Sequence, residues 1–156
     1  MQLSTKGRYS IMAMLELAQM QETEDGQKPV SLSEISKRQD ISLSYLEQLF
    51  AKLRKAGLVV SSRGPGGGYK LAKETYDIKL SEVTQAVEEP ILVTRCSGSA
   101  NCVKGVKCNS HDLWMSLSDH IETFMSDITL AMVLTRNLPE YDASQHQCEN
   151  LAGAAK

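Results

Sequence analysis

The chain has 156 residues, of which 42% are hydrophobic and 23% are charged, and its formal net charge is −2. This length allows one sizeable core or a small domain with an extension, and the composition is that of an ordinary soluble globular protein. The N-terminus has no apolar run behind basic residues, and no window approaches about 18 uncharged apolar residues. We therefore expect neither a signal peptide nor a membrane span. The expected compartment is the cytoplasm, where clustered cysteines favour metal or redox chemistry over disulfides.

The net charge conceals an asymmetry between the two halves of the chain. Residues 1–72 contain ten Lys and Arg against seven Asp and Glu, a net charge of +3. Residues 73–156 contain seven Lys and Arg against twelve Asp and Glu, a net charge of −5. The N-terminal half is therefore the half that can face phosphates, although this signal is weak by itself.

The first predicted element is a buried helix from Tyr9 to about Gln21, because this segment is apolar around most of the helical wheel. Lys6 and Arg8 lie at its predicted start. These two side chains can contact DNA phosphates with help from the helix N-terminus, or they can form a solvated basic end. The polar segment 22–29 predicts a connection.

Two short helices separated by a tight turn follow. Ser31 and Glu34 fit a capping box, which predicts a helix from residue 32 to about residue 38. Ser42 is the expected N-cap of a second helix that ends near Gly57. Apolar residues at helical spacing are expected to point from this helix into the core: Leu43, Leu46, Leu49, Phe50 and Leu53. The pair predicts a helix-turn-helix, whose second helix normally enters the major groove.

The outward face of the second helix carries polar side chains suited to DNA. Gln48 can pair with adenine, whereas Glu47 is repelled by phosphates unless it accepts a hydrogen bond from cytosine N4. Because Glu47 has no cation three or four residues later, we favour base discrimination over a simple exposed carboxylate. The residues of this helix expected to bind DNA are Ser42, Ser44, Tyr45, Glu47, Gln48 and Lys52.

Residues 58–71 predict a β-hairpin, or wing, around a tip of glycines and one proline. The glycines let the backbone approach DNA closely, and Arg63 can enter a narrow minor groove. The candidate DNA contacts of the wing are Arg63, Gly64, Pro65 and Gly66. The alternative is a phosphate-binding nucleotide loop, but such a loop ends in Gly-Lys-Ser/Thr before a helix, whereas this run continues as a strand. A further short helix over residues 78–87 is predicted to stop before Pro90.

Three cysteines at even spacing and one histidine lie within residues 96–111: Cys96, Cys102, Cys108 and His111. Structural zinc sites usually show pairs of cysteines two to four residues apart, and this stretch has none. Iron–sulfur clusters take thiolates from looser loops, and histidine can replace cysteine on one iron. The pattern therefore favours an iron–sulfur cluster, with zinc and free redox thiols as the alternatives.

The fourth ligand of such a site has two candidates. His111 is the favoured one, with a helix-capping role beside Asp112 as its alternative. Cys148 competes, but it lies in a polar, small-residue-rich segment where we expect a spare thiol. Trp114 and Tyr69 are expected to be packing residues. We find no Ser/His/Asp constellation and no carboxylate pair that argues for catalysis, so an enzyme is not expected.

The segment 112–137 predicts one long helix of about 25 residues, or about 40 Å. Its apolar stripe follows helical spacing through Leu113, Leu117, Ile121, Phe124 and Ile128. A small head cannot bury so long a helix alone, so these five residues are the expected interface of a homodimer, with packing inside the monomer as the alternative. Palindromic operators match the two-fold symmetry of such a dimer.

Several segments together resemble a known family, the bacterial winged-helix repressors that sense iron–sulfur clusters: STKGRY, SLSYLEQLF, LRKAGLV and RGPGGGY. The run TRC-x5-C-x5-C-x2-H followed by LW-x-x-LSD is similar to that of the family's iron–sulfur cluster regulators. The resemblance covers the chain from Met1 to about Leu134. It implies a homodimeric transcription factor that binds operator DNA and commonly represses genes for iron–sulfur cluster assembly.

The resemblance also implies one 2Fe–2S cluster per subunit, held by Cys96, Cys102, Cys108 and His111. A nitric-oxide-sensing 4Fe–4S repressor of the same family shares the cysteine spacing but is expected to lack this histidine. An iron–sulfur carrier protein is a less favoured function for the chain, and a Cys/His enzyme is the least favoured.

The predicted fold is mainly α with a small β wing: a winged helix-turn-helix head followed by a long dimerisation helix. The predicted divisions are a DNA-binding domain over 1–90, a cluster-binding loop over 91–111, a dimerisation helix over 112–137 and a disordered tail over 138–156. The tail departs from the family pattern, so the resemblance assigns it no role.

Overall fold

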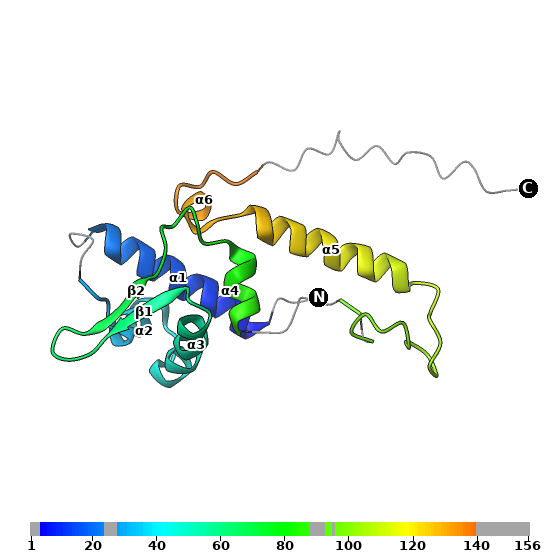
Figure 1. Cartoon of the computed structure of the whole chain (residues 1–156), viewed down its shortest axis with the longest axis horizontal. Coiled ribbons are helices and arrows are strands. Elements are labelled where there is room, and N and C mark those ends of the chain that lie inside the picture. The colour runs from blue at the N-terminus through cyan, green and yellow to red at the C-terminus, as the bar shows by residue number, and fades with distance from the viewer. Residues whose placement is uncertain (1–3, 24–27, 88–92, 95, 140–156) are drawn as a thin grey trace, which may run out of the picture.

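The computed structural model describes residues 4–23, 28–87, 93–94 and 96–139. The helices and strands follow the order α1 (Thr5–Thr23), α2 (Leu32–Gln39), α3 (Leu43–Lys55), β1 (Val59–Ser62), β2 (Gly68–Leu71), α4 (Leu80–Val87), α5 (His111–Asp127) and α6 (Leu130–Leu134). The first six elements form a head, and α5 extends away from it (Figure 1). The fold is therefore mainly helical with one small wing, as the sequence predicts.

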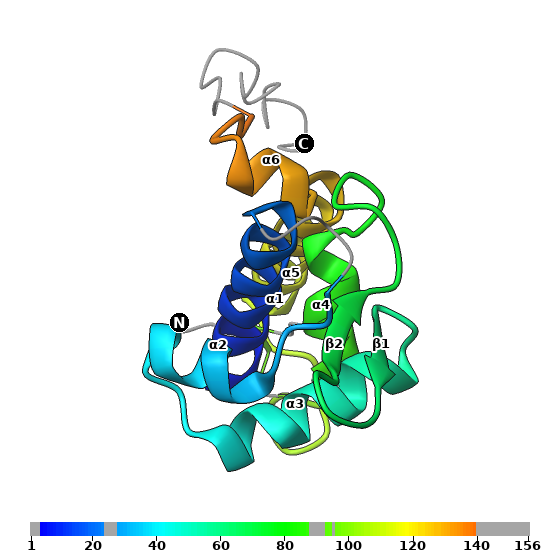
Figure 2. The same ribbon diagram turned by 90° about the vertical axis from the view of Figure 1, so that its left-hand side faces the viewer.

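The core of the head lies among α1, α2, α3 and α4 (Figure 2). Fully buried side chains from four segments fill it, including Met14, Ile35, Phe50 and Val83. Glu16 is only 8% exposed and accepts hydrogen bonds from Arg38 (3.1 Å) and Gln39 (2.5 Å), which ties α2 to α1. A buried carboxylate needs such partners, because desolvation otherwise disfavours its charge.

The helix-turn-helix forms where the sequence predicts it. The Ser31 hydroxyl accepts a hydrogen bond from the Glu34 amide (3.3 Å), and the Glu34 carboxylate accepts one from the Ser31 amide (3.1 Å), which completes the capping box. Asp40 adopts the left-handed conformation (φ 51°) in the turn. Ser42 then caps α3 by accepting a hydrogen bond from the Tyr45 amide.

The C-terminus of α3 ends as predicted near Gly57, which follows the C-cap residue and has φ 75°. The Gly57 amide bonds to the Arg54 carbonyl (3.0 Å) and the Leu58 amide to the Leu53 carbonyl (3.0 Å), which is the Schellman pattern. The prediction that Leu43 lies in the core is wrong, because this residue is 42% exposed. It occupies the first position of α3, where the helix starts beyond the edge of the core.

The predicted wing is an antiparallel pair in which Val59 faces Leu71 and Ser62 faces Gly68. A third segment pairs with it, because the amide and carbonyl of Val30 both bond to Tyr69. A Cβ atom on Gly68 would stand 2.3 Å from the Val30 carbonyl oxygen, so only glycine allows this approach. The Tyr69 ring packs edge-on against Phe50, which confirms its packing role.

Helix α1 begins at Thr5, four residues before the predicted start at Tyr9. Lys6 and Arg8 therefore lie inside its first turn. The Ser4 carbonyl and hydroxyl accept hydrogen bonds from the amides of Arg8 and Gly7, so the chain turns into the helix at Ser4.

The prediction of one long helix over 112–137 is wrong. Helix α5 ends at Asp127, and Ile128 takes an extended conformation before Thr129 caps α6. The Leu80 amide bonds to the Ile128 carbonyl, and the Leu130 amide bonds to the carbonyl of residue 78. These bonds to the head replace further helical turns, and they bury Ile128 and Leu130 in the core.

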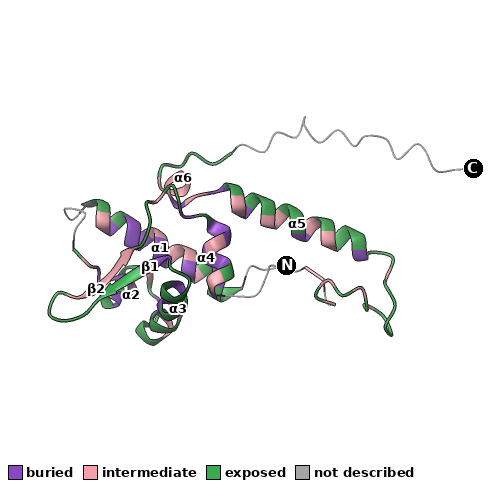
Figure 3. Cartoon of the chain, viewed as in Figure 1, coloured by how far each residue is buried: buried purple, intermediate pink, exposed green. Residues whose placement is uncertain are grey.

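Ile128 is consequently not a dimer-interface residue, because it is only 1% exposed within one subunit. The rest of α5 differs: only His111, Ser118 and Met125 are buried along its length. The other residues of α5 are exposed or half-buried (Figure 3).

Candidate metal centre and nucleic-acid interface

A tightly turned loop carries the cysteines. Ser97 and Ala100 have φ of 49° and 57°, a left-handed conformation that is uncommon for residues with a Cβ atom. Thr94 stabilises the first turn, because its Oγ1 accepts a 2.9 Å hydrogen bond from the Gly98 amide. A second short turn at the loop tip is closed by reciprocal backbone hydrogen bonds between residues 103 and 106. The loop thus reverses direction between successive cysteines.

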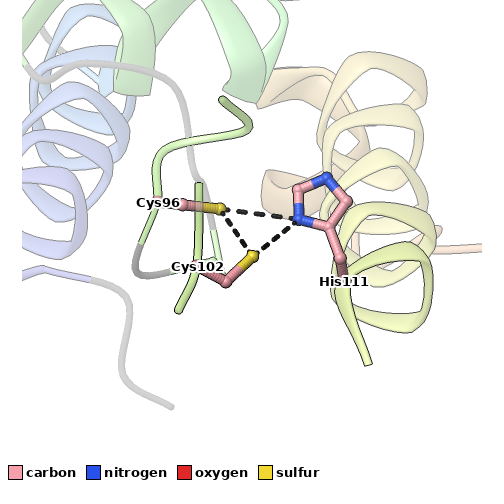
Figure 4. A group of neighbouring side chains, drawn as sticks. All are labelled: Cys96, Cys102 and His111. Atoms are coloured by element: carbon pink, nitrogen blue, oxygen red, sulfur yellow. Dashed lines mark hydrogen bonds between the residues drawn. The ribbon is translucent and has the colours of Figure 1, made fainter. Parts of the chain in front are cut away.

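Cys96, Cys102 and His111 converge on one point (Figure 4). The two sulfur atoms are 3.5 Å apart, and Nδ1 of His111 lies 3.5 Å from Cys96 Sγ and 3.3 Å from Cys102 Sγ. His111 is the first residue of α5 and is only 6% exposed. Two ligands bound about 2.3 Å from one metal ion stand at most about 4.6 Å apart, so these three atoms are close enough to share a metal.

Cys108 lines the same cavity of about 350 Å³, although its sulfur lies outside the tightest group of three. Its Sγ is 3.6 Å from the Ser110 hydroxyl oxygen. Trp114 forms part of the cavity wall and is 39% exposed. All four predicted ligands therefore border one cavity, and three of them meet directly.

The loop favours the ionised form of two thiols. Desolvation opposes ionisation of Cys96, but hydrogen bonds with Cys102, Thr94 and backbone amides outweigh it and lower the pKa of Cys96 to about 6. Two hydrogen bonds lower the pKa of Cys108. The one with Ser110 has the larger effect, and the one with Cys102 has the smaller effect. For Cys102 a backbone hydrogen bond at Cys108 favours the thiolate, yet desolvation and the neighbouring sulfurs together raise its pKa. Thiolates are the form that binds metal.

The donor set fits an iron–sulfur cluster. Three thiol sulfurs and one imidazole nitrogen are soft or borderline ligands, which suit zinc, copper(I) and iron–sulfur clusters. Within the described residues the converging group contains no carboxylate, and Mg²⁺ and Ca²⁺ prefer oxygen ligands. The competing ligand Cys148 lies outside the described residues, as does the predicted tail from residue 140 onward.

The predicted DNA contacts are exposed at the N-terminal turn of α1, on α3 and at the wing tip, with one exception. Tyr45 is half-buried, and its ring packs edge-on against Tyr9 at a centroid distance of 5.9 Å. The remaining predicted positions are Lys6, Arg8, Ser42, Ser44, Glu47, Gln48, Lys52, Arg63, Gly64, Pro65 and Gly66.

Two of these exposed side chains also have structural partners. The Ser42 hydroxyl caps α3. The Lys52 ammonium donates a 3.1 Å hydrogen bond to the Val87 carbonyl at the end of α4. Lys52 therefore joins the predicted recognition helix to the element that precedes the cysteine loop.

Part of the predicted dimer interface is exposed to solvent on α5. Leu113 is 62% exposed and Phe124 is 51% exposed. Leu117 is half-buried, and Ile121 is half-buried against the core of the head. Leu113, Leu117 and Phe124 thus form an apolar stripe of α5 that is at least partly exposed.

Sequence reasoning missed the contributions of Ser110, Trp114 and Thr94 to the site. The sequence predicts a packing role for Trp114, whereas in the structure its side chain borders the cavity. The only signal is proximity, because Thr94 precedes Cys96 by two residues and Ser110 directly precedes His111. Small hydroxyl residues are too common in loops for that spacing to be informative.

Within the described part of the chain, no helix is both long enough and apolar enough to cross a membrane. The Rrf2 family, described as iron-dependent transcriptional regulators, matches residues 3–136. The HTH-type transcriptional regulator IscR of Vibrio atlanticus (strain LGP32) is 51% identical over 137 residues, which cover 88% of this chain and 77% of that protein.

Solved structures agree with this match. The structure titled T. potens IscR is 39% identical, with a TM-score of 0.70 over 88% of each chain. CymR, the global cysteine regulator of B. subtilis, is 32% identical, with a TM-score of 0.71 over 87% of this chain and 98% of that one. The winged-helix head, the helix after the cysteine loop and these matches lead to one conclusion: the chain belongs to the Rrf2 family of transcriptional regulators.

Proposed function

We propose that this protein is an iron–sulfur-cluster-sensing transcriptional regulator that binds operator DNA as a homodimer and represses genes for iron–sulfur cluster assembly. One 2Fe–2S cluster per subunit would be held by Cys96, Cys102, Cys108 and His111. When bound, the cluster would supply a redox- and iron-sensitive link between the cysteine loop and α5. The predicted divisions of the chain, with the DNA-binding domain over 1–90 and the cluster-binding loop over 91–111, are part of this proposal.

The observation that carries the proposal is the convergence of two thiols and one buried imidazole beside a third thiol. A histidine at the start of a surface helix is ordinarily solvated, whereas His111 is 6% exposed and its Nδ1 faces Cys96 and Cys102. This arrangement, in a member of a family of iron-dependent regulators, supports a ligand set of mixed sulfur and nitrogen. It favours a 2Fe–2S cluster over the 4Fe–4S cluster of a nitric-oxide sensor.

The DNA-binding part of the proposal rests on the exposed face of α3 and on the wing. Gln48 and Glu47 are exposed near the N-terminal half of α3, where recognition helices reach base edges. Arg63 is exposed at the base of the wing tip. Relatives named as HTH-type transcriptional regulators support this assignment, and they argue against a carrier protein or an enzyme.

The homodimer is supported by the apolar stripe of α5. Leu113 is 62% exposed and Phe124 is 51% exposed on this helix. A second copy of this helix would bury the stripe, and two-fold pairing would place two α3 helices for the two halves of a palindromic operator.

A series of hydrogen bonds and packing contacts connects the cavity to the recognition helix α3. The Val93 amide at the entrance of the loop donates a 3.0 Å hydrogen bond to Ser118 of α5. Helix α5 packs against α4, and the Lys52 bond to Val87 links α4 to α3. In this proposal, cluster binding fixes the loop on α5 and shifts the population toward a dimer with different DNA preferences.

The test is purification without oxygen, followed by visible absorption spectroscopy and analysis of iron and acid-labile sulfide. The proposal predicts a coloured protein with two irons and two sulfides per subunit. The same material, before and after chelation, is then used to select duplexes from a random-sequence library. Zinc without sulfide, or four irons per subunit, would contradict the proposed cofactor.

A further inference from the structure

Ser110 occupies the N-cap position of α5, yet its hydroxyl does not cap the helix. Serine is favoured at this position because its oxygen normally accepts a hydrogen bond from an amide of the first turn. Ser31, Ser42 and Thr129 all do so at the starts of α2, α3 and α6. The hydroxyl of Ser110 is therefore engaged elsewhere.

Its partners are a tryptophan on one side and a cysteine sulfur on the other. The indole Nε1–H of Trp114 donates a 3.2 Å hydrogen bond to Ser110 Oγ. Ser110 Oγ lies 3.6 Å from Cys108 Sγ. Because an indole N–H can only donate, the serine oxygen is the acceptor of the first bond, and its own proton is free for the sulfur. A thiolate at Cys108 can only accept, so the chain runs from Trp114 through Ser110 to Cys108.

We propose that Ser110 is a positioning residue of the metal centre, which donates a hydrogen bond to the Cys108 sulfur and is itself oriented by Trp114. This inference rests on the proposed function, because it concerns Cys108 as a ligand. Three features of Ser110 and Trp114 suit this role. Both side chains line the cavity, both residues lie at the start of α5, and the Ser110 hydroxyl makes no competing cap hydrogen bond.

The physical consequence has a definite sign. Hydrogen bonds to ligand sulfurs are among the factors that set the reduction potential of an iron–sulfur cluster. A bond donated to the Cys108 sulfur stabilises the additional negative charge of the reduced form more than it stabilises the oxidised form. Its loss should therefore shift the reduction potential to a more negative value.

The first measurement uses the full chain without metal, under reducing conditions. The sequence contains a single tryptophan, so selective ¹⁵N labelling gives one indole N–H resonance that needs no assignment. Ser110→Ala should shift this resonance upfield and speed its exchange with water. Ser110→Thr retains the hydroxyl and should leave it close to its wild-type position. Ser116→Ala, an exposed serine of the same helix, is the matched control.

The second measurement uses the same variants loaded with iron and sulfide. A titration with dithionite adds one electron per cluster, and no bond breaks. Ser110→Ala should have a more negative midpoint potential than wild type, whereas Ser110→Thr and Ser116→Ala should match it. Trp114→Phe should shift the potential in the same direction by a smaller amount, because the serine loses its orienting donor but keeps its proton.

The outcomes separate this inference from the function on which it rests. If the wild-type protein takes up no cluster, the proposed function fails, whatever the indole resonance shows. If the wild type is loaded and Ser110→Ala has an unchanged potential, the positioning role of Ser110 is overturned. An indole resonance that is the same in Ser110→Ala and wild type would also overturn it, because the first bond of the chain would then be missing.

Discussion

His111 brings a nitrogen donor to a cavity that is otherwise bordered by sulfur donors, with its Nδ1 within 3.5 Å of two sulfurs. We expect His111→Ala to weaken cluster retention by more than the roughly 10- to 100-fold that loss of an outer-shell partner costs. His111→Cys should retain a cluster with a more negative potential, because histidine ligation raises it. Visible spectra and iron content measure both effects. His120→Ala, on the same helix, is the control and should resemble wild type.

Glu47 is exposed on α3 and is expected to discriminate between operators. Glu47→Ala should relax selectivity at one base pair by about 1–3 kcal/mol, because a mismatched contact at a base edge costs that much. Binding to a panel of single-base operator variants at fixed salt measures it. Glu74→Ala, another exposed glutamate, is the control. Equal rankings of the panel by wild type and Glu47→Ala would remove this role.

Single residues also show where sequence reasoning reaches its limit. The ligand candidates can be predicted because three cysteines and a histidine rarely share a polar loop without a function. The role of Ser110 cannot be predicted, because a serine before a helix predicts a cap, and only the structure shows its hydroxyl turned toward Cys108. Helical spacing assigns Leu43 to the core, but spacing does not show where a helix starts relative to the core.

At the scale of elements, the capping box of α2 makes a pH-dependent contribution to stability. The hydrogen bond from Ser31 is the main cause that lowers the pKa of Glu34 below its ordinary value of 4.5. Because the folded-state pKa is the lower one, the stabilisation is complete above the unfolded-state pKa and is lost as the pH falls through the folded-state pKa.

Urea unfolding of the metal-free protein tests this contribution. Glu34→Gln should be less stable than wild type at pH 7 by no more than about 1 kcal/mol, since the site is exposed and capping energies are of this size. The difference should shrink as the pH falls through the folded-state pKa of Glu34, because the wild-type carboxylate then becomes protonated. Glu74→Gln serves as the control. A difference that grows as the pH falls would contradict the assigned sign.

The break between α5 and α6 marks the limit of prediction for elements. The helical spacing of apolar residues through Phe124, Ile128 and Ala131 predicts a continuous helix. This pattern depends only on which residues are apolar. The backbone bonds of Ile128 and Leu130 to residues 78–80 compete with that helix, and they join segments far apart in the sequence. The winged head can be predicted because caps, turns and glycines are local signals.

At the scale of the whole molecule, the apolar stripe that the sequence predicts for the dimer interface contains residues of two kinds in the structure. Phe124→Glu should dissociate the proposed homodimer while leaving the fold intact, because Phe124 is 51% exposed. Ile128→Ala, directly after α5, should cost about 2–5 kcal/mol of stability, because it opens a cavity in the core. Sedimentation and urea unfolding separate the two effects. Ser116→Glu, also exposed on α5, should change neither, and a dimeric Phe124→Glu variant would contradict the proposed interface.

The most direct test of cluster control over DNA binding compares the DNA preferences of one protein preparation in two states. Protein purified without oxygen and loaded with its cluster, and the same protein after chelation, would each select duplexes from the same random library at the same salt concentration. We expect the two states to enrich different sequences, or to bind the loaded-state operator with different affinity. Identical enriched sequences with equal affinities would contradict cluster control, because the metal centre would then not act on the DNA-binding heads.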